Sequence, residues 1–278
     1  MKLNKFYVDD IIKTAINEDI NYIDTSADLV FSDDDRTTAY FVAKADGVLC
    51  GIDVAFRVFE LLDDTFECKI YKKDGEEIKT GDLIADFSGK TACLLKGERT
   101  ALNLLQHMSG IATATNNAVK LIDGTNASVA DTRKTLPGLR ALQKYAVTVG
   151  GGKNHRYNLS DGVMLKDNHI DACGSITAAV EKVRKNLGHM VKIEVETRNL
   201  DEVKEAVDTG VEVIMLDNMS NDEMAQAVEY VNGRALLEAS GNITAQTIKA
   251  VAQTGVDIIS IGALTHSVKA FDISMKIK

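Results

Sequence analysis

The second half of the chain alternates short apolar runs with amphipathic helical stretches. This alternation, which begins near residue 127, is typical of βα units and predicts a parallel sheet covered by helices. The expected strands are residues 127–132, 162–167, 191–197, 211–218, 235–241 and 257–263. A series of such units predicts an α/β barrel, either closed or partly open.

Polar or small residues stand where nearly every one of these strands is expected to end. In chain order they are Arg133, Lys166, Glu196, Asp217, Ser240 and Gly262. Because the carboxyl ends of the strands in a β/α barrel share one face, these residues would converge from distant parts of the sequence. The pattern therefore predicts a single pocket at that face.

The charge distribution indicates an anionic ligand for this pocket. The whole chain carries a net charge of −9, which disfavours nucleic acid and anionic membranes as partners. Between Asp131 and Ile170, however, seven Lys or Arg residues stand against three acids, a local charge of +4. Pro137 and the run Gly150–Gly152 lie in the same segment and favour converging loops over a helix surface.

The candidate cations are Arg133, Lys134, His155, Arg156 and Lys166. Arginine binds a carboxylate through two parallel hydrogen bonds, and several cations around one pocket indicate a ligand with more than one negative charge. Lys166 has a second interpretation, because a lysine at a barrel strand end can form a Schiff base, as in aldolases. We expect His155 to contact the ligand and His169 to be structural.

Two acids, Glu196 and Asp217, are expected on adjacent βα units. Carboxylates at such positions need cations, and Mg²⁺ is commonly held by one or two carboxylates together with substrate phosphate oxygens. The alternative is a salt bridge to a nearby Lys or Arg. Under strict strand alternation Glu194 shares the face of Glu196 and can join the pair.

The candidate phosphate-binding residues are Ser240, Gly241, Asn242, Gly262 and Ala263. Small residues leave main-chain N–H groups accessible, and the late strands of β/α barrels are the usual place for a phosphate. The first three residues precede a helix expected to begin near Thr244, whose N-terminus would favour the same ligand.

The first part of the chain has a different pattern. The expected helices are residues 7–18 and 51–62, and the expected strands are 37–46, 66–71 and 82–88. These elements predict a small α+β domain over residues 1–107, followed by a barrel domain over 108–269. A long helical stretch from 94 to 121 connects the two, with Gly110 as a candidate break.

The sequence carries no pattern for export or membrane insertion. The first twenty residues mix lysines and acids in an amphipathic pattern, and no apolar run approaches the length of a membrane span. The four cysteines stand far apart without a CxxC pair, which disfavours disulfides and zinc. We therefore expect a cytoplasmic protein that does not contact membranes.

Several segments together carry a family resemblance. They are ERTALNLLQHMSGIAT from Glu98, DTRKTLPGLR from Asp131, KYAVTVGGGKNHRYNLSDGVMLKDNHI from Lys144, EVET from Glu194, MLDN from Met215, EASGNI from Glu238 and SIGALTHS from Ser260. Over essentially its whole length the chain resembles the quinolinate phosphoribosyltransferases, also called nicotinate-nucleotide pyrophosphorylases (carboxylating). Thr148 departs from many relatives, which carry a basic residue before the triple glycine.

The resemblance implies an open, seven-stranded α/β barrel of the type II phosphoribosyltransferases and a smaller N-terminal α+β domain. The C-terminal tail, residues 270–278, would rejoin that smaller domain. The implied assembly is a homodimer, with higher oligomers left open, in which Arg99 reaches the partner's site. The implied reaction joins quinolinate to 5-phosphoribosyl 1-pyrophosphate and yields nicotinate mononucleotide, pyrophosphate and carbon dioxide, a step of de novo NAD biosynthesis.

The resemblance also implies a role for each site residue. Quinolinate would be bound by Arg99, Arg133, Lys134, His155, Arg156 and Lys166, and Thr132 would also contact substrate. The catalytic residues would be Lys166, Glu196 and Asp217, of which the two acids would bind Mg²⁺ and the ribose hydroxyls. The substrate phosphates would contact Ser240, Gly241, Asn242, Gly262, Ala263 and His266.

Three alternatives stand beside this interpretation. A pyrophosphorylase-like paralogue linked to molybdenum transport would keep the phosphate site and change the acid pocket, but the full Arg/His/Lys set favours quinolinate. A Schiff-base aldolase would use Lys166. A sensor that only binds a dicarboxylate would have no use for Glu196 and Asp217.

Overall fold

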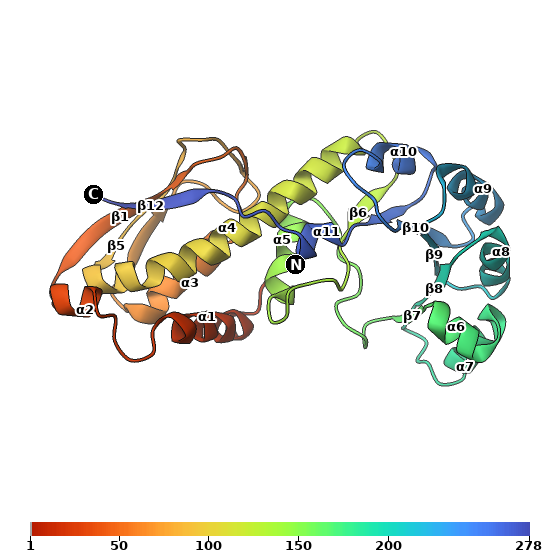
Figure 1. Ribbon diagram of the computed structural model, residues 1–278, viewed down its shortest axis with the longest axis horizontal. Coiled ribbons are helices and arrows are strands. Elements are labelled where there is room, and N and C mark those ends of the chain that lie inside the picture. The colour runs from red at the N-terminus through yellow and green to blue at the C-terminus, as the bar shows by residue number, and fades with distance from the viewer. Residues whose placement is uncertain (1) are drawn as a thin grey trace. The chain divides into compact units, whose positions relative to one another are not determined.

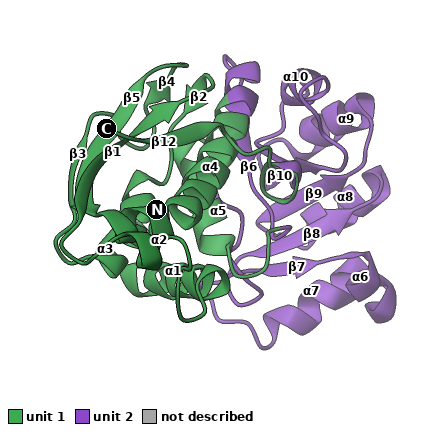
Figure 2. Ribbon diagram, turned by 60° about the vertical axis from the view of Figure 1, so that its left-hand side comes forward, with its two compact units in different colours: residues 1–116, 135–151, 264–278 green, residues 117–134, 152–263 purple. Residues whose placement is uncertain are grey.

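The computed structural model describes residues 2–278, which form two compact units that we treat separately (Figure 2). Unit 1 comprises the N-terminal segment up to Asn116, residues 135–151 and Leu264–Lys278. Unit 2 comprises Asn117–Lys134 and Gly152–Ala263. The domain boundaries given above, 1–107 with 270–278 and 108–269, stay a prediction.

Unit 1 is built on a four-stranded antiparallel sheet. Its strand order is β12–β1–β5–β3, in which β1 is Arg36–Ala43, β3 is Glu67–Ile70, β5 is Leu83–Lys90 and β12 is Ile273–Ile277. Alternate side chains of β1 are buried, as expected for a strand with one face on a core. The last strand of the chain pairs with β1, where Phe41 lies opposite Met275.

Helices and an aromatic cluster complete unit 1. Its remaining elements are α1 (Lys5–Asp19), α2 (Ala27–Val30), β2 (Gly47–Val48), α3 (Ile52–Leu62), β4 (Glu77–Ile78), α5 (Arg140–Val149) and, beginning at its boundary, α11 (Ala263–His266). The core contains Phe41, Phe56, Phe59, Phe66 and Phe87, with 4.8 Å between the ring centroids of Phe41 and Phe87. The α+β class predicted for this part of the chain is confirmed.

Helix α4 (Thr91–Leu121) runs without interruption through Gly110, so the candidate break at this residue is wrong. A Cβ atom at Gly110 would lie only 2.2 Å from the carbonyl oxygen of Lys269. The glycine therefore allows the segment before β12 to approach the helix closely, and it does not end the helix.

Unit 2 is a parallel sheet with connecting helices. Its strand order is β6–β11–β10–β9–β8–β7, with β6 at Ser128–Ala130, β7 at Val163–Leu165, β8 at Ile193–Thr197, β9 at Val213–Asp217, β10 at Leu236–Ser240 and β11 at Ile258–Ser260. The helices are α6 (Asp167–Cys173), α7 (Ile176–Arg184), α8 (Leu200–Asp208), α9 (Asn221–Val231) and α10 (Ile248–Gln253). Figure 1 shows α8 and α9 together on one side of β8 and β9. The predicted α/β class is confirmed.

The sheet of unit 2 has six strands rather than the seven that the family resemblance implies. Beyond β6 it is extended by an isolated parallel bridge between Ala130 and Lys153. Because β7 to β11 are parallel and adjacent in chain order, their carboxyl ends lie along one edge. This edge carries the site described below.

The register of the central strands arranges side chains in rows. Glu196 pairs with Met215 across β8 and β9, and Met215 pairs with Glu238 across β9 and β10. One step nearer the carboxyl edge, Asp217 pairs with Ser240. Since paired residues in a sheet share a face, the two rows place acids and hydroxyls on the same side.

Over the described residues, none of the helices combines the length and apolar character that crossing a bilayer requires.

Candidate active site

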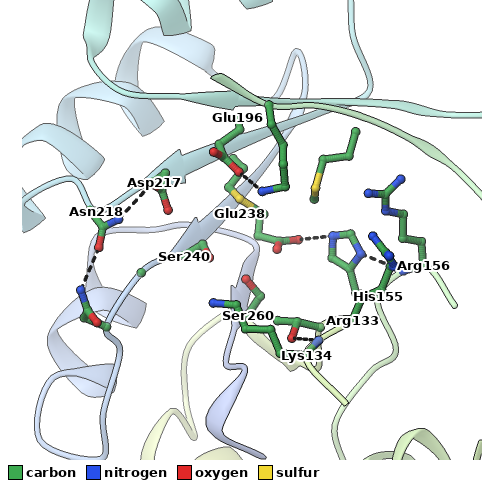
Figure 3. A pocket seen from close by; sticks show the side chains of 16 residues that line it. Arg133, Lys134, His155, Arg156, Glu196, Asp217, Asn218, Glu238, Ser240 and Ser260 are labelled. Atoms are coloured by element: carbon green, nitrogen blue, oxygen red, sulfur yellow. Dashed lines mark hydrogen bonds and ion pairs between the residues drawn. The ribbon is translucent and has the colours of Figure 1, made fainter. Parts of the chain in front are cut away.

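A cavity of about 570 Å³ opens at the carboxyl edge of the unit 2 sheet (Figure 3). Its lining residues are Thr132, Arg133, Lys134, His155, Arg156, Met164, Lys166, Glu196, Met215, Asp217, Asn218, Glu238, Ser240, Gly241, Asn242 and Ser260. All belong to unit 2. The side chains expected to meet at the strand ends are therefore brought together around one cavity.

Four of the expected site residues are not among those that line the cavity. Gly262 and Ala263 follow β11, which ends at Ser260, and Ser260 lines the cavity in their place. Arg99 on α4 and His266 on α11 belong to unit 1, so their contacts with substrate stay predictions.

Not all basic residues between Asp131 and Ile170 meet at the cavity. Residues 140–149 form helix α5 of unit 1, where Lys144 is fully buried. Converging loops were therefore the wrong interpretation for Arg140 and Lys144. His169, expected to be structural, accepts a hydrogen bond from the main-chain N–H of Lys166 at 3.0 Å.

Cations occupy one side of the cavity. The Nε atom of Arg133 is buried and has no hydrogen-bond partner within the described chain. Arg156 donates from Nη1 to the carbonyl oxygen of Gly162 at 2.8 Å, and burial, followed by the proximity of Arg133, lowers the pKa of its guanidinium. An anion with two carboxylates would neutralise this group and satisfy the Arg133 donor.

Acids occupy another side of the cavity. Lys166 Nζ lies 2.5 Å from Glu196 Oε2, so the amine is held in an ion pair and is not presented alone to a carbonyl. Asp217 Oδ2 accepts a hydrogen bond from Asn218 Nδ2 at 2.9 Å. Two carboxylates on adjacent strands are too few for a cage made by protein alone, but they fit Mg²⁺, which keeps waters and substrate oxygens among its ligands.

The loop after β10 forms a third side, made of Ser240, Gly241 and Asn242. Asn242 Nδ2 donates to Asn218 Oδ1 at 3.2 Å, and both asparagines adopt left-handed backbone conformations. The helix expected near Thr244 begins only at Ile248, so a helix N-terminus at this position is the wrong expectation. Accessible N–H groups of the loop itself are what this side offers an anion.

Substitution of Gly241 by alanine is expected to disturb the loop after β10, where the sequence predicts phosphate binding. Gly241 has a φ of +100°, and an added Cβ would lie 2.2 Å from Asn218 Oδ1. The Asn218 amide must then move away from Asp217 and Asn242, which we expect to raise the KM for a phosphorylated substrate about tenfold. Steady-state kinetics measure this. The control is Gly188→Ala, at which nothing lies within 4 Å of the added Cβ; equal kinetics of the two variants would contradict the prediction.

Sequence reasoning missed five lining residues, namely Met164, Met215, Asn218, Glu238 and Ser260. Four of them lie within strands, where the sequence pattern indicates which residues are buried but not which of them face a cavity. Glu238 had a readable signal, because it lies two residues before Ser240 and therefore on the same face of β10. It is 1% exposed, and burial followed by the Glu194 carboxylate raises its pKa to about 7.

The free energy of unfolding is expected to fall as the pH rises from about 4.5 to about 7. The folded-state pKa of Glu238 lies above its ordinary value of 4.5, so in this window the native state binds more protons than the unfolded state. This one residue accounts for a loss of about 1–3 kcal/mol. Urea unfolding at pH 5 and pH 8 measures the loss, which should be smaller in Glu238→Gln; an equal loss in both proteins would contradict the assignment.

Fold and site together define an α/β enzyme whose cavity, at the carboxyl edge of a parallel sheet, has a cationic side, an acidic side and a loop of small residues. The quinolinate phosphoribosyl transferase models match residues 24–109 with their N-terminal domain and residues 111–276 with their C-terminal domain. The chain belongs to the quinolinate phosphoribosyltransferase family.

Individual relatives agree with this assignment. The chain is 44% identical over 275 residues to a probable nicotinate-nucleotide pyrophosphorylase (carboxylating) of Bacillus subtilis, covering 99% of this chain and 95% of that protein. It is 48% identical over 245 residues to the protein of the same description from Synechocystis, covering 87% of this chain and 83% of that one. The solved structure of NadC from Streptococcus pyogenes superposes with a TM-score of 0.97 at 43% identity, covering 100% of this chain and 99% of that chain.

Proposed function

We propose that this chain transfers a phosphoribosyl group from 5-phosphoribosyl 1-pyrophosphate to quinolinate and releases pyrophosphate and carbon dioxide. The product is nicotinate mononucleotide, and the enzyme is a carboxylating nicotinate-nucleotide diphosphorylase of NAD biosynthesis. The observation that carries the proposal is one cavity with a buried, unpartnered arginine donor on its cationic side and two carboxylates on adjacent strands on its acidic side. The aldolase, sensor and molybdenum-linked alternatives are set aside with this assignment.

The cations hold the acid substrate. Arg133 and Arg156 bind its carboxylates, and Lys134 adds a third positive charge. Together they orient the ring so that its nitrogen faces the sugar held at the opposite side. A near-attack geometry of this kind lowers the barrier by removing the entropy of bringing two molecules together.

The acids act on the sugar. Glu196 and Asp217 bind the ribose hydroxyls and stabilise positive charge that develops at the anomeric carbon. Glu196 and Asp217 would also hold Mg²⁺ together with substrate oxygens, and the ion would supply positive charge for the pyrophosphate leaving group. Lys166 forms an ion pair with Glu196 and can orient that carboxylate.

Transfer and loss of carbon dioxide follow in order. The ring nitrogen of quinolinate attacks the anomeric carbon while the bond to pyrophosphate breaks. The nitrogen is then a pyridinium, which accepts the electron pair of the adjacent carbon–carbon bond as the neighbouring carboxylate leaves as carbon dioxide. A proton then replaces the lost carboxylate. No protein nucleophile is needed.

The first test of this function is a product assay with purified protein, quinolinate, 5-phosphoribosyl 1-pyrophosphate and Mg²⁺. We expect pyrophosphate and carbon dioxide in equal amounts, and neither with nicotinate as the control acid, because nicotinate lacks the second carboxylate. Pyrophosphate without carbon dioxide, or no product at all, would contradict the proposal. Omission of Mg²⁺ should suppress both products.

A homodimer in which Arg99 completes the partner's site is the assembly we propose. The residue is exposed on α4, as a side chain that reaches another chain must be, and whether dimers associate further stays open. The cytoplasmic location expected from the sequence stays a prediction.

Intersubunit complementation tests the dimer. Co-expression of Arg99→Ala with Arg133→Ala is expected to restore up to about a quarter of the wild-type sites, because half of the random dimers are mixed and each mixed dimer has one intact site. Each variant alone should be far less active. The control pair is Arg133→Ala with Asp217→Asn, whose defects lie in the same subunit's cavity and leave no intact site. Activity of the first pair no higher than that of the control pair would contradict the shared site.

A further inference from the structure

A buried cluster of two carboxylates and an imidazole includes two residues that line the cavity, His155 and Glu238. His155 Nε2 is 3.0 Å from Glu194 Oε2 and 3.5 Å from Glu238 Oε2, and one ligand atom from each of the three residues lies within 4.8 Å of the others. Glu194 is 6% exposed and Glu238 1% exposed. Figure 3 shows the Glu238 carboxylate directed at the imidazole.

The hydrogen bonds of His155 define its tautomer. The main-chain N–H of Arg156 donates to His155 Nδ1 at 2.8 Å, so Nδ1 carries a lone pair and the ring proton is on Nε2. That proton points at Glu194 and Glu238. The main-chain N–H of His155 donates to the buried Asp131 Oδ1 at 2.9 Å. Side chain and backbone of His155 are therefore both anchored, and both ring nitrogens are engaged by the protein.

Stability alone does not account for the two glutamates. They occupy interior positions of β8 and β10, and the Oε1 atom of each is buried without a hydrogen-bond partner among the described residues. Two neighbouring carboxylates without full solvation oppose folding, as the raised pKa of Glu238 reflects. Apolar side chains at the same positions would avoid this cost, so a buried carboxylate pair of which Glu238 lines the cavity points to a role at the cavity.

The cluster is connected to the cationic side of the cavity. Arg156 is the residue after His155, its main-chain N–H is held by the His155 ring, and Glu194 electrostatically favours its charged form against the repulsion of Arg133. Movement of the imidazole would remove the support of the backbone from which the Arg156 guanidinium extends. The carboxylate pair, the imidazole and Arg156 thus form one continuous chain of contacts.

We propose that Glu194 and Glu238 are positioning residues for quinolinate: they hold the His155 imidazole, which holds the main chain at Arg156 and so places its guanidinium in the acid pocket. This inference rests on the proposed function. In this role the carboxylates act on quinolinate through His155, which lines the cavity and keeps the ligand contact that the family resemblance implies. The affinity for quinolinate therefore depends on two side chains from the interior of the sheet.

Matched substitutions separate positioning from bulk packing. Glu194→Gln and Glu238→Gln keep an acceptor for His155 Nε2–H, whereas Glu194→Met and Glu238→Met keep a similar size and remove it. We expect the methionine variants to raise the KM for quinolinate about tenfold or more, the range of one hydrogen bond between a charged and a neutral group. The glutamine variants should stay within about threefold of wild type, and kcat and the KM for 5-phosphoribosyl 1-pyrophosphate should change by less than about threefold in all four.

Two outcomes would overturn the positioning role. One is that Glu194→Met and Glu238→Met both fold, as judged by circular dichroism and thermal unfolding, and both keep the wild-type KM for quinolinate. The other outcome comes from nitrogen-15 NMR of histidine-labelled wild-type protein, in which the His155 signals are assigned by comparison with His155→Gln. We expect the His155 ring to be protonated at Nε2. Protonation at Nδ1 would refute the arrangement. If the wild-type protein released no pyrophosphate from the two substrates, the proposed function itself would fail; an active wild type with unaffected methionine variants would reject only the positioning role.

Discussion

Asp217→Asn is expected to reduce kcat by about 10²–10³-fold, the usual cost of removing one preorganised electrostatic group from an active site. The carboxylate ends β9 at the cavity and accepts a hydrogen bond from Asn218 at 2.9 Å, which an asparagine oxygen can also accept. The substitution therefore removes charge and leaves shape almost unchanged. Steady-state kinetics give kcat, and calorimetry in the absence of the sugar substrate gives the affinity for quinolinate, which we expect to change by less than about threefold.

The matched control is Asp222→Asn. Asp222 is an exposed acid in the first turn of α9, so its replacement removes one negative charge away from the cavity. Wild-type kinetics are expected. An equal loss of turnover and of quinolinate affinity in Asp217→Asn would contradict the division of the cavity into an acidic and a cationic side.

Arg133→Ala is expected to weaken quinolinate binding about tenfold to a hundredfold. A hydrogen bond to a charged group contributes about 1.5–3 kcal/mol, and the buried Arg133 Nε has no partner in the described chain that could compensate. Calorimetry with quinolinate alone measures the change directly.

Arg133→Lys provides the graded control for this prediction. Lysine keeps the positive charge but lacks the planar fork that binds a carboxylate through two hydrogen bonds, so an intermediate affinity is expected. An unchanged affinity in Arg133→Ala would show that the acid binds elsewhere.

The fold was largely predictable because its strands and helices have clean periodicity. The unit 2 strands around 193–197, 213–217 and 236–240 are apolar runs that end in polar residues, and parallel topology then brings these ends to one edge. Gly110 was wrongly predicted as a helix break because the glycine instead leaves room for the main chain of Lys269. Such a tertiary contact cannot be seen in a local sequence pattern. Thr244 was misread as a helix start because a turn, closed by the Thr247 N–H to the Thr244 carbonyl, precedes α10.

The site was predictable only in its outer layer. Residues after a strand end, such as Arg133 and Asn242, are visible in a sequence because packing does not explain them. Glu238 lies two residues before the end of β10 and therefore deeper in the sheet. Its position beside Met215 depends on the register of β9 and β10, and its contact with His155 depends on a loop that is distant in the sequence. Family resemblance supplied Arg99, which no property of a single chain could have indicated.

The pairing of β12 with β1 has a consequence for how the protein is made. A ribosome releases β1 early, whereas residues 273–277 emerge only after every residue of unit 2. The usual order, in which N-terminal domains complete themselves first, is therefore reversed here. Until residues 273–277 have emerged, one backbone edge of β1 is unpaired, so chains that stop before β12 are exposed to misassembly with one another and depend on chaperones.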